Sequence, residues 1–75
     1  MTVEEFVKKV QNELQDTPAE LVSPETNYKD LDEWGSLTSL SLISMIEEEY
    51  DKLITGSDIR KCNSVKELWE FVEAL

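Results

Sequence analysis

The side chains in this sequence that could take part in covalent chemistry are the hydroxyl of Ser36, which opens an apolar segment, and the single thiol, Cys62. The chain contains no histidine, which removes the commonest general base and a common metal ligand. One cysteine can form neither an internal disulfide nor a zinc site of the Cys/His type. Asp30 and Asp32 begin a calcium-loop pattern, but no glutamate follows at the required spacing. We therefore expect no enzyme, no catalytic residue and no metal site, and we expect Cys62 to be a small, semi-buried structural residue.

The sequence around Ser36 predicts the start of a helix that runs to Tyr50 or Asp51. Gly35 is conformationally permissive, and a serine directly before an apolar periodic segment is typical of an N-cap. A helix N-terminus also favours a bound phosphate, because its unpaired N–H groups point at it. Ser36 could therefore be only a structural cap, or it could be a serine that another enzyme modifies.

Two faces of this helix differ in character when its residues are placed at about 100° intervals around the axis. The core stripe consists of Leu42, Ile43, Ile46 and Tyr50. A second arc, roughly 140° wide on the same construction, mixes apolar, hydroxyl and acidic side chains. Its members are Ser36, Leu37, Leu40, Ser41, Ser44, Glu47 and Glu48. An apolar centre with a charged rim suits a transient docking surface, although Leu37 and Leu40 could instead tuck under the preceding loop.

The other elements must hold this helix in place. Thr2 and Glu5 have capping-box spacing before an amphipathic segment that ends at Leu14, and Ser64 and Glu67 have the same spacing before a last helix that ends at Leu75. A short helical turn is predicted over residues 57–61. The fold class is therefore all-α: a small four-helix bundle with three longer helices, one short helix and a long first loop.

The long first connection, about residues 16–35, contains two prolines and several apolar residues. Irregular connections of this length are uncommon in small domains and tend to be functional or tied down. We expect its apolar residues to anchor it across the bundle. These residues are Leu21, Val22, Tyr28, Leu31 and Trp34.

The composition narrows the class of function. With 75 residues we expect a single domain, 1–75, and the net charge of −10 excludes a nucleic-acid binder that acts through phosphate contacts. The acidity predicts attraction to basic partner surfaces, or it serves solubility alone. The N-terminal segment has no long apolar run, so neither a signal peptide nor membrane insertion is expected, and the predicted location is cytoplasmic.

One segment of the sequence resembles a known family. The run Trp34-Gly35-Ser36-Leu37, followed by the apolar helix and the acidic run that ends at Tyr50, is similar to the central segment of the acyl carrier proteins. In that family an Asp-Ser-Leu motif opens the second helix, and an acidic run ending in an aromatic residue closes it. The resemblance extends over nearly the whole chain.

The resemblance implies a phosphoprotein in which a separate phosphopantetheinyl transferase attaches 4′-phosphopantetheine from coenzyme A to Ser36. The arm would then hold acyl or related groups as thioesters for acyl-loading and acyl-using enzymes with basic docking surfaces. It implies that Leu37, Leu40, Glu47 and Glu48 form the partner-docking face. We also expect the protein to be a monomer.

The chain also departs from the family pattern. In the family motif, the aspartate helps to present the serine to the transferase, and this chain has Gly35 in its place. Thr38 and Ser41 occupy positions that are often acidic in fatty-acid carriers. These changes suit a specialised carrier in lipid, natural-product (fatty acid or polyketide) or surface-polymer biosynthesis. The alternative is an unmodified acyl-carrier-like module for protein–protein interaction.

Overall fold

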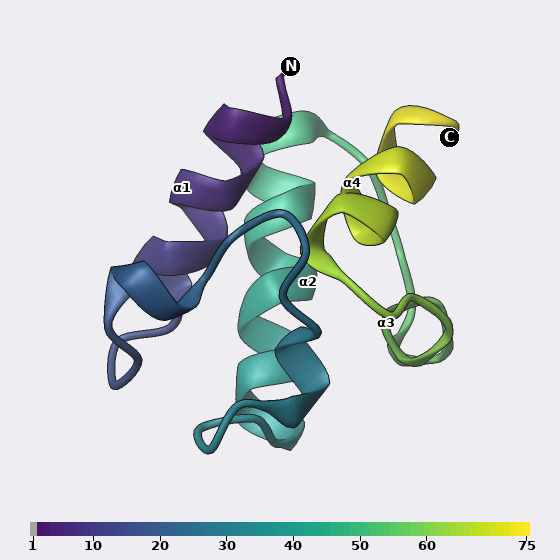
Figure 1. Cartoon of the computed structure of the whole chain (residues 1–75). Helices are drawn as coiled ribbons and strands as arrows, with labels where there is room; N and C mark the ends of the chain where they lie inside the picture. The colour runs from purple at the N-terminus through teal and green to yellow at the C-terminus, as the bar shows by residue number, and fades with distance from the viewer. Residues whose placement is uncertain (1) are drawn as a thin grey trace.

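The computed structural model describes residues 2–75, and this part of the chain is all-helical, as predicted. The elements in chain order are α1 (Val3–Glu13), the 3₁₀ turns η1 (Ala19–Leu21) and η2 (Tyr28–Asp30), α2 (Ser36–Tyr50), α3 (Gly56–Lys61) and α4 (Val65–Glu73). α2 runs through the middle of the molecule, with α1 on one side and α4 on the other (Figure 1). No helix in residues 2–75 is both long enough and apolar enough to span a membrane.

The first helix forms as its sequence predicts. The hydroxyl of Thr2 accepts a hydrogen bond from the backbone N–H of Glu5 at 3.2 Å, which satisfies one of the free donors at the start of α1. Phe6, Val7 and Val10 lie three and four residues apart and are all buried. The apolar spacing of α1 therefore places one face of this helix in the core.

The last two helices begin at side-chain caps. Thr55 and Asp58 form a reciprocal capping box, which starts α3 at Gly56, one residue before the predicted turn. Ser64 accepts from the backbone N–H of Glu67 at 3.0 Å, as predicted for the start of α4. The Glu67 carboxylate, however, accepts from the backbone N–H of Asn63 at 3.1 Å rather than from Ser64.

The core is built around α2. Leu42 and Ile46 are fully buried, and Ile43 and Tyr50 are partly buried against the same cluster, so the predicted stripe is confirmed. Met45 is also buried, which the stripe did not include, because α1 packs against this side of α2. The other fully buried large side chains come from α1, α3, α4 and the long connection.

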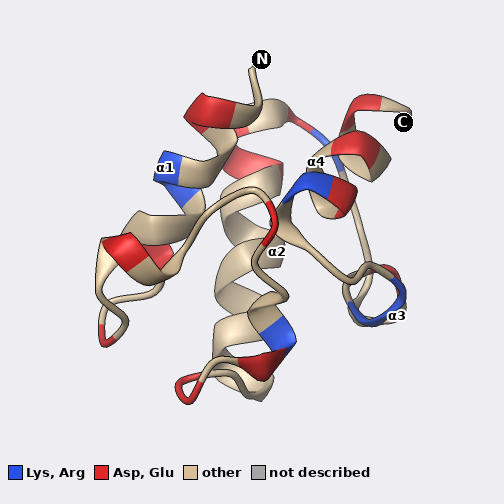
Figure 2. Ribbon diagram, viewed as in Figure 1, with Lys and Arg blue, Asp and Glu red and all other residues tan. Residues whose placement is uncertain are grey.

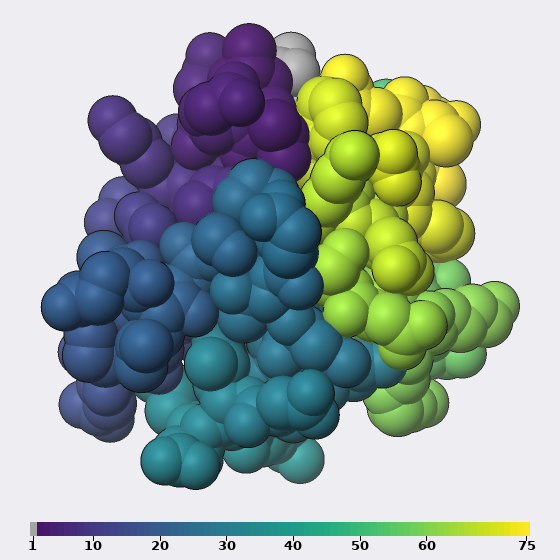
Figure 3. Space-filling model, viewed as in Figure 1, coloured from purple at the N-terminus to yellow at the C-terminus, as the bar shows by residue number. Residues whose placement is uncertain are grey.

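The long connection is tied down by hydrogen bonds to both outer helices. The Gln11 side chain on α1 donates to the carbonyls of Ala19 at 3.1 Å and Val22 at 3.0 Å. Two backbone N–H groups at the start of α4 donate to carbonyls of the connection, at 2.9 and 2.8 Å. The connection therefore covers the front of the molecule between α1 and α4, as the space-filling view shows (Figure 3).

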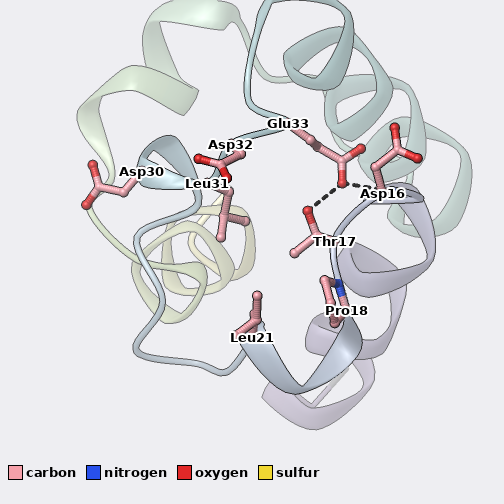
Figure 4. A pocket seen from close by; sticks show the side chains of 8 residues that line it. All are labelled: Asp16, Thr17, Pro18, Leu21, Asp30, Leu31, Asp32 and Glu33. Carbon is pink, nitrogen blue, oxygen red and sulfur yellow. Dashed lines mark hydrogen bonds between the residues drawn. The ribbon is translucent and has the colours of Figure 1, made fainter.

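Tyr28 is the main apolar anchor of the connection. Its side chain is fully buried, and its hydroxyl donates to the carbonyl of Ile59 at 2.6 Å; burial raises the pKa of this phenol. Trp34 packs against it with ring centroids 5.0 Å apart. Val22 is buried and Leu31 is partly buried, as predicted, but Leu21 is 57% exposed. The anchoring role predicted for Leu21 is therefore wrong, because this side chain lines an open pocket of the connection instead of entering the core (Figure 4).

Candidate functional site

Ser36 is the first helical residue of α2 rather than its N-cap. Gly35 takes the cap position in an extended conformation, and its carbonyl already accepts the first intrahelical bond, from the Ser39 N–H at 2.9 Å. No side chain caps this helix end. The prediction that Ser36 is the N-cap is therefore wrong, and the reason is that the backbone becomes helical one residue earlier than the serine pattern indicates. The hydroxyl of Ser36 is free of a capping role.

Thr38 and Glu33 fix the start of α2 to the preceding loop. The Thr38 hydroxyl donates to the backbone carbonyl of Glu33 at 2.7 Å. The Glu33 carboxylate in turn accepts from the Thr17 hydroxyl and from the backbone N–H of Asp16, across the mouth of a pocket in the connection (Figure 4). These bonds hold the start of α2 in place without using the Ser36 side chain. Ser36 is exposed at the N-terminal end of the helix, and its hydroxyl makes no hydrogen bond within the described residues.

Gly35 is not required by the backbone or by packing at this position. Its φ of 180° is extended backbone that any residue can adopt, and a Cβ added there would have no atom within 4 Å. The departure of this chain from the Asp-Ser-Leu motif therefore leaves room for the missing side chain. The sequence alone could not decide between an obligatory glycine and a replaceable one.

Ser36 stands between two open hollows of the surface. One, of about 600 Å³, lies toward the long connection and has three carboxylates in its lining, from Glu13, Asp16 and Glu33. The other, of about 530 Å³, lies toward α3, and Trp34, Leu40, Ile43 and Arg60 contribute to its lining. An exposed primary hydroxyl at a helix N-terminus, with open space on both sides, is compatible with a long phosphate-linked group at this serine.

The predicted docking residues lie on the exposed surface of α2. Leu37 is 82% exposed and Leu40 is 59% exposed, so neither tucks under the long connection, and that alternative is wrong. Glu47 and Glu48 are also exposed, at the far end of the same helix, where acidic residues gather (Figure 2). α2 thus exposes apolar side chains near Ser36 and carboxylates about three turns further along the helix.

Cys62 lies outside this surface. It is buried at the C-terminal end of α3, and burial raises the pKa of its thiol. A buried thiol with a raised pKa is a poor nucleophile. This agrees with the structural role that we predicted for it.

Arg60, whose side chain lines the hollow beside Ser36, was not predicted to be near this serine. The sequence of a short helix does not indicate which other element a basic residue in it will face.

The fold is a small all-helical bundle with an exposed serine at the start of its central helix. The family described as "Phosphopantetheine attachment site" matches residues 4–72. The chain therefore belongs to this family, whose members carry 4′-phosphopantetheine covalently on a serine and are not themselves catalysts. A search of curated proteins and a search of solved structures each found no match.

Proposed function

We propose that this protein is a carrier in which Ser36 holds the 4′-phosphopantetheine arm. The observation that supports this most directly is the position of Ser36: it is the first residue of α2, it is exposed, and its hydroxyl has no structural task. Thr38 and Glu33 hold the helix start in its place, so modification of the serine breaks no contact of the fold.

The chemistry of attachment is divided between this chain and its transferase. The Ser36 oxygen attacks the phosphorus next to pantetheine in coenzyme A, the pyrophosphate bond breaks, and 3′,5′-ADP leaves. The transferase supplies the base that takes the serine proton and the metal that stabilises the leaving phosphate. This chain presents the hydroxyl, and the unpaired N–H groups of the first turn of α2 stabilise the new phosphodiester. The bound arm supplies a thiol that carries the transported group as a thioester.

Intact mass spectrometry tests this proposal. The protein is incubated with coenzyme A, magnesium and a broad-specificity phosphopantetheinyl transferase. We expect a gain of one phosphopantetheine, mapped to Ser36 by peptide mass. No gain with several transferases, on a sample that is helical by circular dichroism, would contradict the carrier function and leave an unmodified docking module.

We further propose that the four exposed residues Leu37, Leu40, Glu47 and Glu48 dock the partner enzymes. The apolar pair lies next to the serine, and the carboxylates meet basic side chains of the partner. Exposed charge pairs act mainly on the rate of encounter, and salt screens them. The pathway that fits best is a specialised cytoplasmic one, in lipid, natural-product or surface-polymer synthesis.

Charge reversal tests the acidic half of this surface. For the double variant Glu47→Lys/Glu48→Lys, we expect kcat/KM of the transferase reaction to fall roughly tenfold at low salt, because steering by charge raises association rates by about that factor or more. The loss should shrink as salt is added. The double variant Glu70→Lys/Glu73→Lys makes the same charge change on α4 and is the control. Equal losses in the two variants would show that net charge, rather than this surface, matters.

Restoring the motif aspartate tests the role of Gly35. We expect Gly35→Asp to raise kcat/KM of phosphopantetheine transfer several-fold, because the site has room for the side chain and the family motif uses an aspartate to present the serine. An aspartate at this cap position should also stabilise the fold by about 0.5 kcal/mol. The control variant Gly35→Asn introduces a side chain of the same size as aspartate but without its negative charge. A Gly35→Asp protein that is modified no faster than the original would contradict the prediction.

A further inference from the structure

The two hollows that meet at Ser36 carry opposite charge. The hollow toward the connection has the carboxylates of Glu13, Asp16 and Glu33 in its lining and no basic residue. The hollow toward α3 has Arg60 and no carboxylate in its lining. A group attached to Ser36 can extend into either one, and its own charge decides which.

The carboxylate of Glu33 is a fixed charge on the first side. Its two hydrogen bonds, from the Thr17 hydroxyl and the Asp16 N–H, hold it at the wall of the connection (Figure 4). It cannot swing away from an anion that approaches Ser36 without breaking both bonds. The first hollow therefore repels a negatively charged group.

The guanidinium of Arg60 is available on the second side. Its Nη1 lies 3.4 Å from the position that a Cβ on Gly56 would occupy, so the side chain folds back toward the start of α3. Its own carbonyl accepts from the Lys29 ammonium at 2.7 Å, which ties the backbone of this residue to the connection. Within residues 2–75 the Arg60 side chain forms no ion pair. An unpaired guanidinium binds phosphate oxygens through two parallel N–H groups.

We propose that Arg60 binds the phosphodiester of the arm and so places the arm over the apolar hollow between α2 and α3, where Trp34, Leu40 and Ile43 face it. This inference rests on the proposed attachment at Ser36. A phosphodiester keeps one negative charge at neutral pH. The helix N-terminus attracts that charge, the three carboxylates repel it from one side, and Arg60 attracts it to the other.

Phosphorus NMR of the modified protein tests the contact directly. We compare the modified forms of the original protein, Arg60→Gln and Lys61→Gln. Lys61 neighbours Arg60 in α3, is also exposed, and does not contribute to this hollow, so Lys61→Gln is the matched loss of one charge. We expect the phosphorus resonance of Arg60→Gln to differ from that of the original protein, and Lys61→Gln to match the original.

Salt provides a second readout that does not depend on activity. Raising the salt to about 500 mM shortens the screening length to about 4 Å, and should move the original resonance toward that of Arg60→Gln. The phosphorus resonance of Arg60→Gln itself should change little when the salt is raised. In the same samples, the indole N–H signal of Trp34 should shift when the arm is attached, and that of Trp69 on α4 should not.

Intact mass separates a failure of this inference from a failure of the proposed function. If all three proteins gain the arm, with peptide mass placing it on Ser36, but their phosphorus resonances agree, the proposed function stands and Arg60 does not bind the phosphate. If Lys61→Gln changes the resonance as much as Arg60→Gln does, the effect is general charge and the contact is refuted. If none gains the arm, the proposed function fails and this inference falls with it.

Discussion

Replacing Ser36 with alanine is expected to abolish attachment of the arm completely while the protein remains folded. The hydroxyl oxygen is the atom that forms the bond to phosphorus, so its loss leaves no acceptor. Intact mass after incubation with coenzyme A and a transferase measures the result. Because Ser36 is not the N-cap and alanine has the higher helix propensity, the free energy of unfolding should change by only a few tenths of a kcal/mol, compared with the roughly 1 kcal/mol of a lost serine cap.

The control for this variant is Ser44→Ala. Ser44 is an exposed serine of the same helix, two turns further on, and it should leave the mass gain unchanged. A phosphopantetheine gain that persists in Ser36→Ala would refute the assigned site. Unfolding of Ser36→Ala, seen as a loss of helical circular dichroism, would refute the claim that this serine has no structural task.

Replacing Tyr28 is expected to have the largest effect on stability. Tyr28 is fully buried and connects the long loop to the end of α3 through its hydroxyl. Tyr28→Ala should lower the free energy of unfolding by about 3–5 kcal/mol, as for other buried aromatic residues cut to alanine. A domain of this size has about 4–11 kcal/mol in total, so this loss is a large fraction of the stability and should move the unfolding midpoint to a much lower urea concentration. Urea denaturation followed by circular dichroism measures this.

The hydroxyl contribution is tested separately with two phenylalanine variants. Tyr28→Phe removes the donor to the Ile59 carbonyl and should cost about 1–3 kcal/mol, because the carbonyl stays buried without its partner. Tyr50→Phe is the matched control: its hydroxyl is buried and has no hydrogen-bond partner in residues 2–75, so its loss should be neutral or stabilising. Equal effects of the two variants would contradict the anchoring role of Tyr28.

The helices and their caps follow from local sequence. Thr2 and Ser64 were predicted as caps, and their hydroxyls accept the bonds that start α1 and α4; Thr55, which was not predicted, caps α3 in the same way. Local spacing is sufficient here because a cap bond spans only two or three residues. The same spacing placed the core stripe of α2 correctly, with the exception of Met45.

The identity of the candidate serine also came from the sequence, through the motif around Ser36 and the acidic run that follows it. The family match over residues 4–72 confirms the class of protein. The local pattern placed Ser36 wrongly at the N-cap, because an N-cap residue and the first helical residue differ only in their backbone angles. At this helix start, the Thr38 hydroxyl also bonds to the carbonyl of Glu33 in the preceding loop.

The tertiary structure alone decided which side chains surround Ser36. Leu21 was predicted to be an anchor and is exposed, whereas Arg60, distant in sequence, lines the hollow beside the serine. These outcomes depend on how the long connection crosses the bundle and on where α3 packs. Both are contacts between residues far apart in the chain, which neither composition nor periodicity encodes. The sequence by itself determined the class of carrier and the candidate serine, and the packing of the connection and α3 decided the charge on either side of that serine.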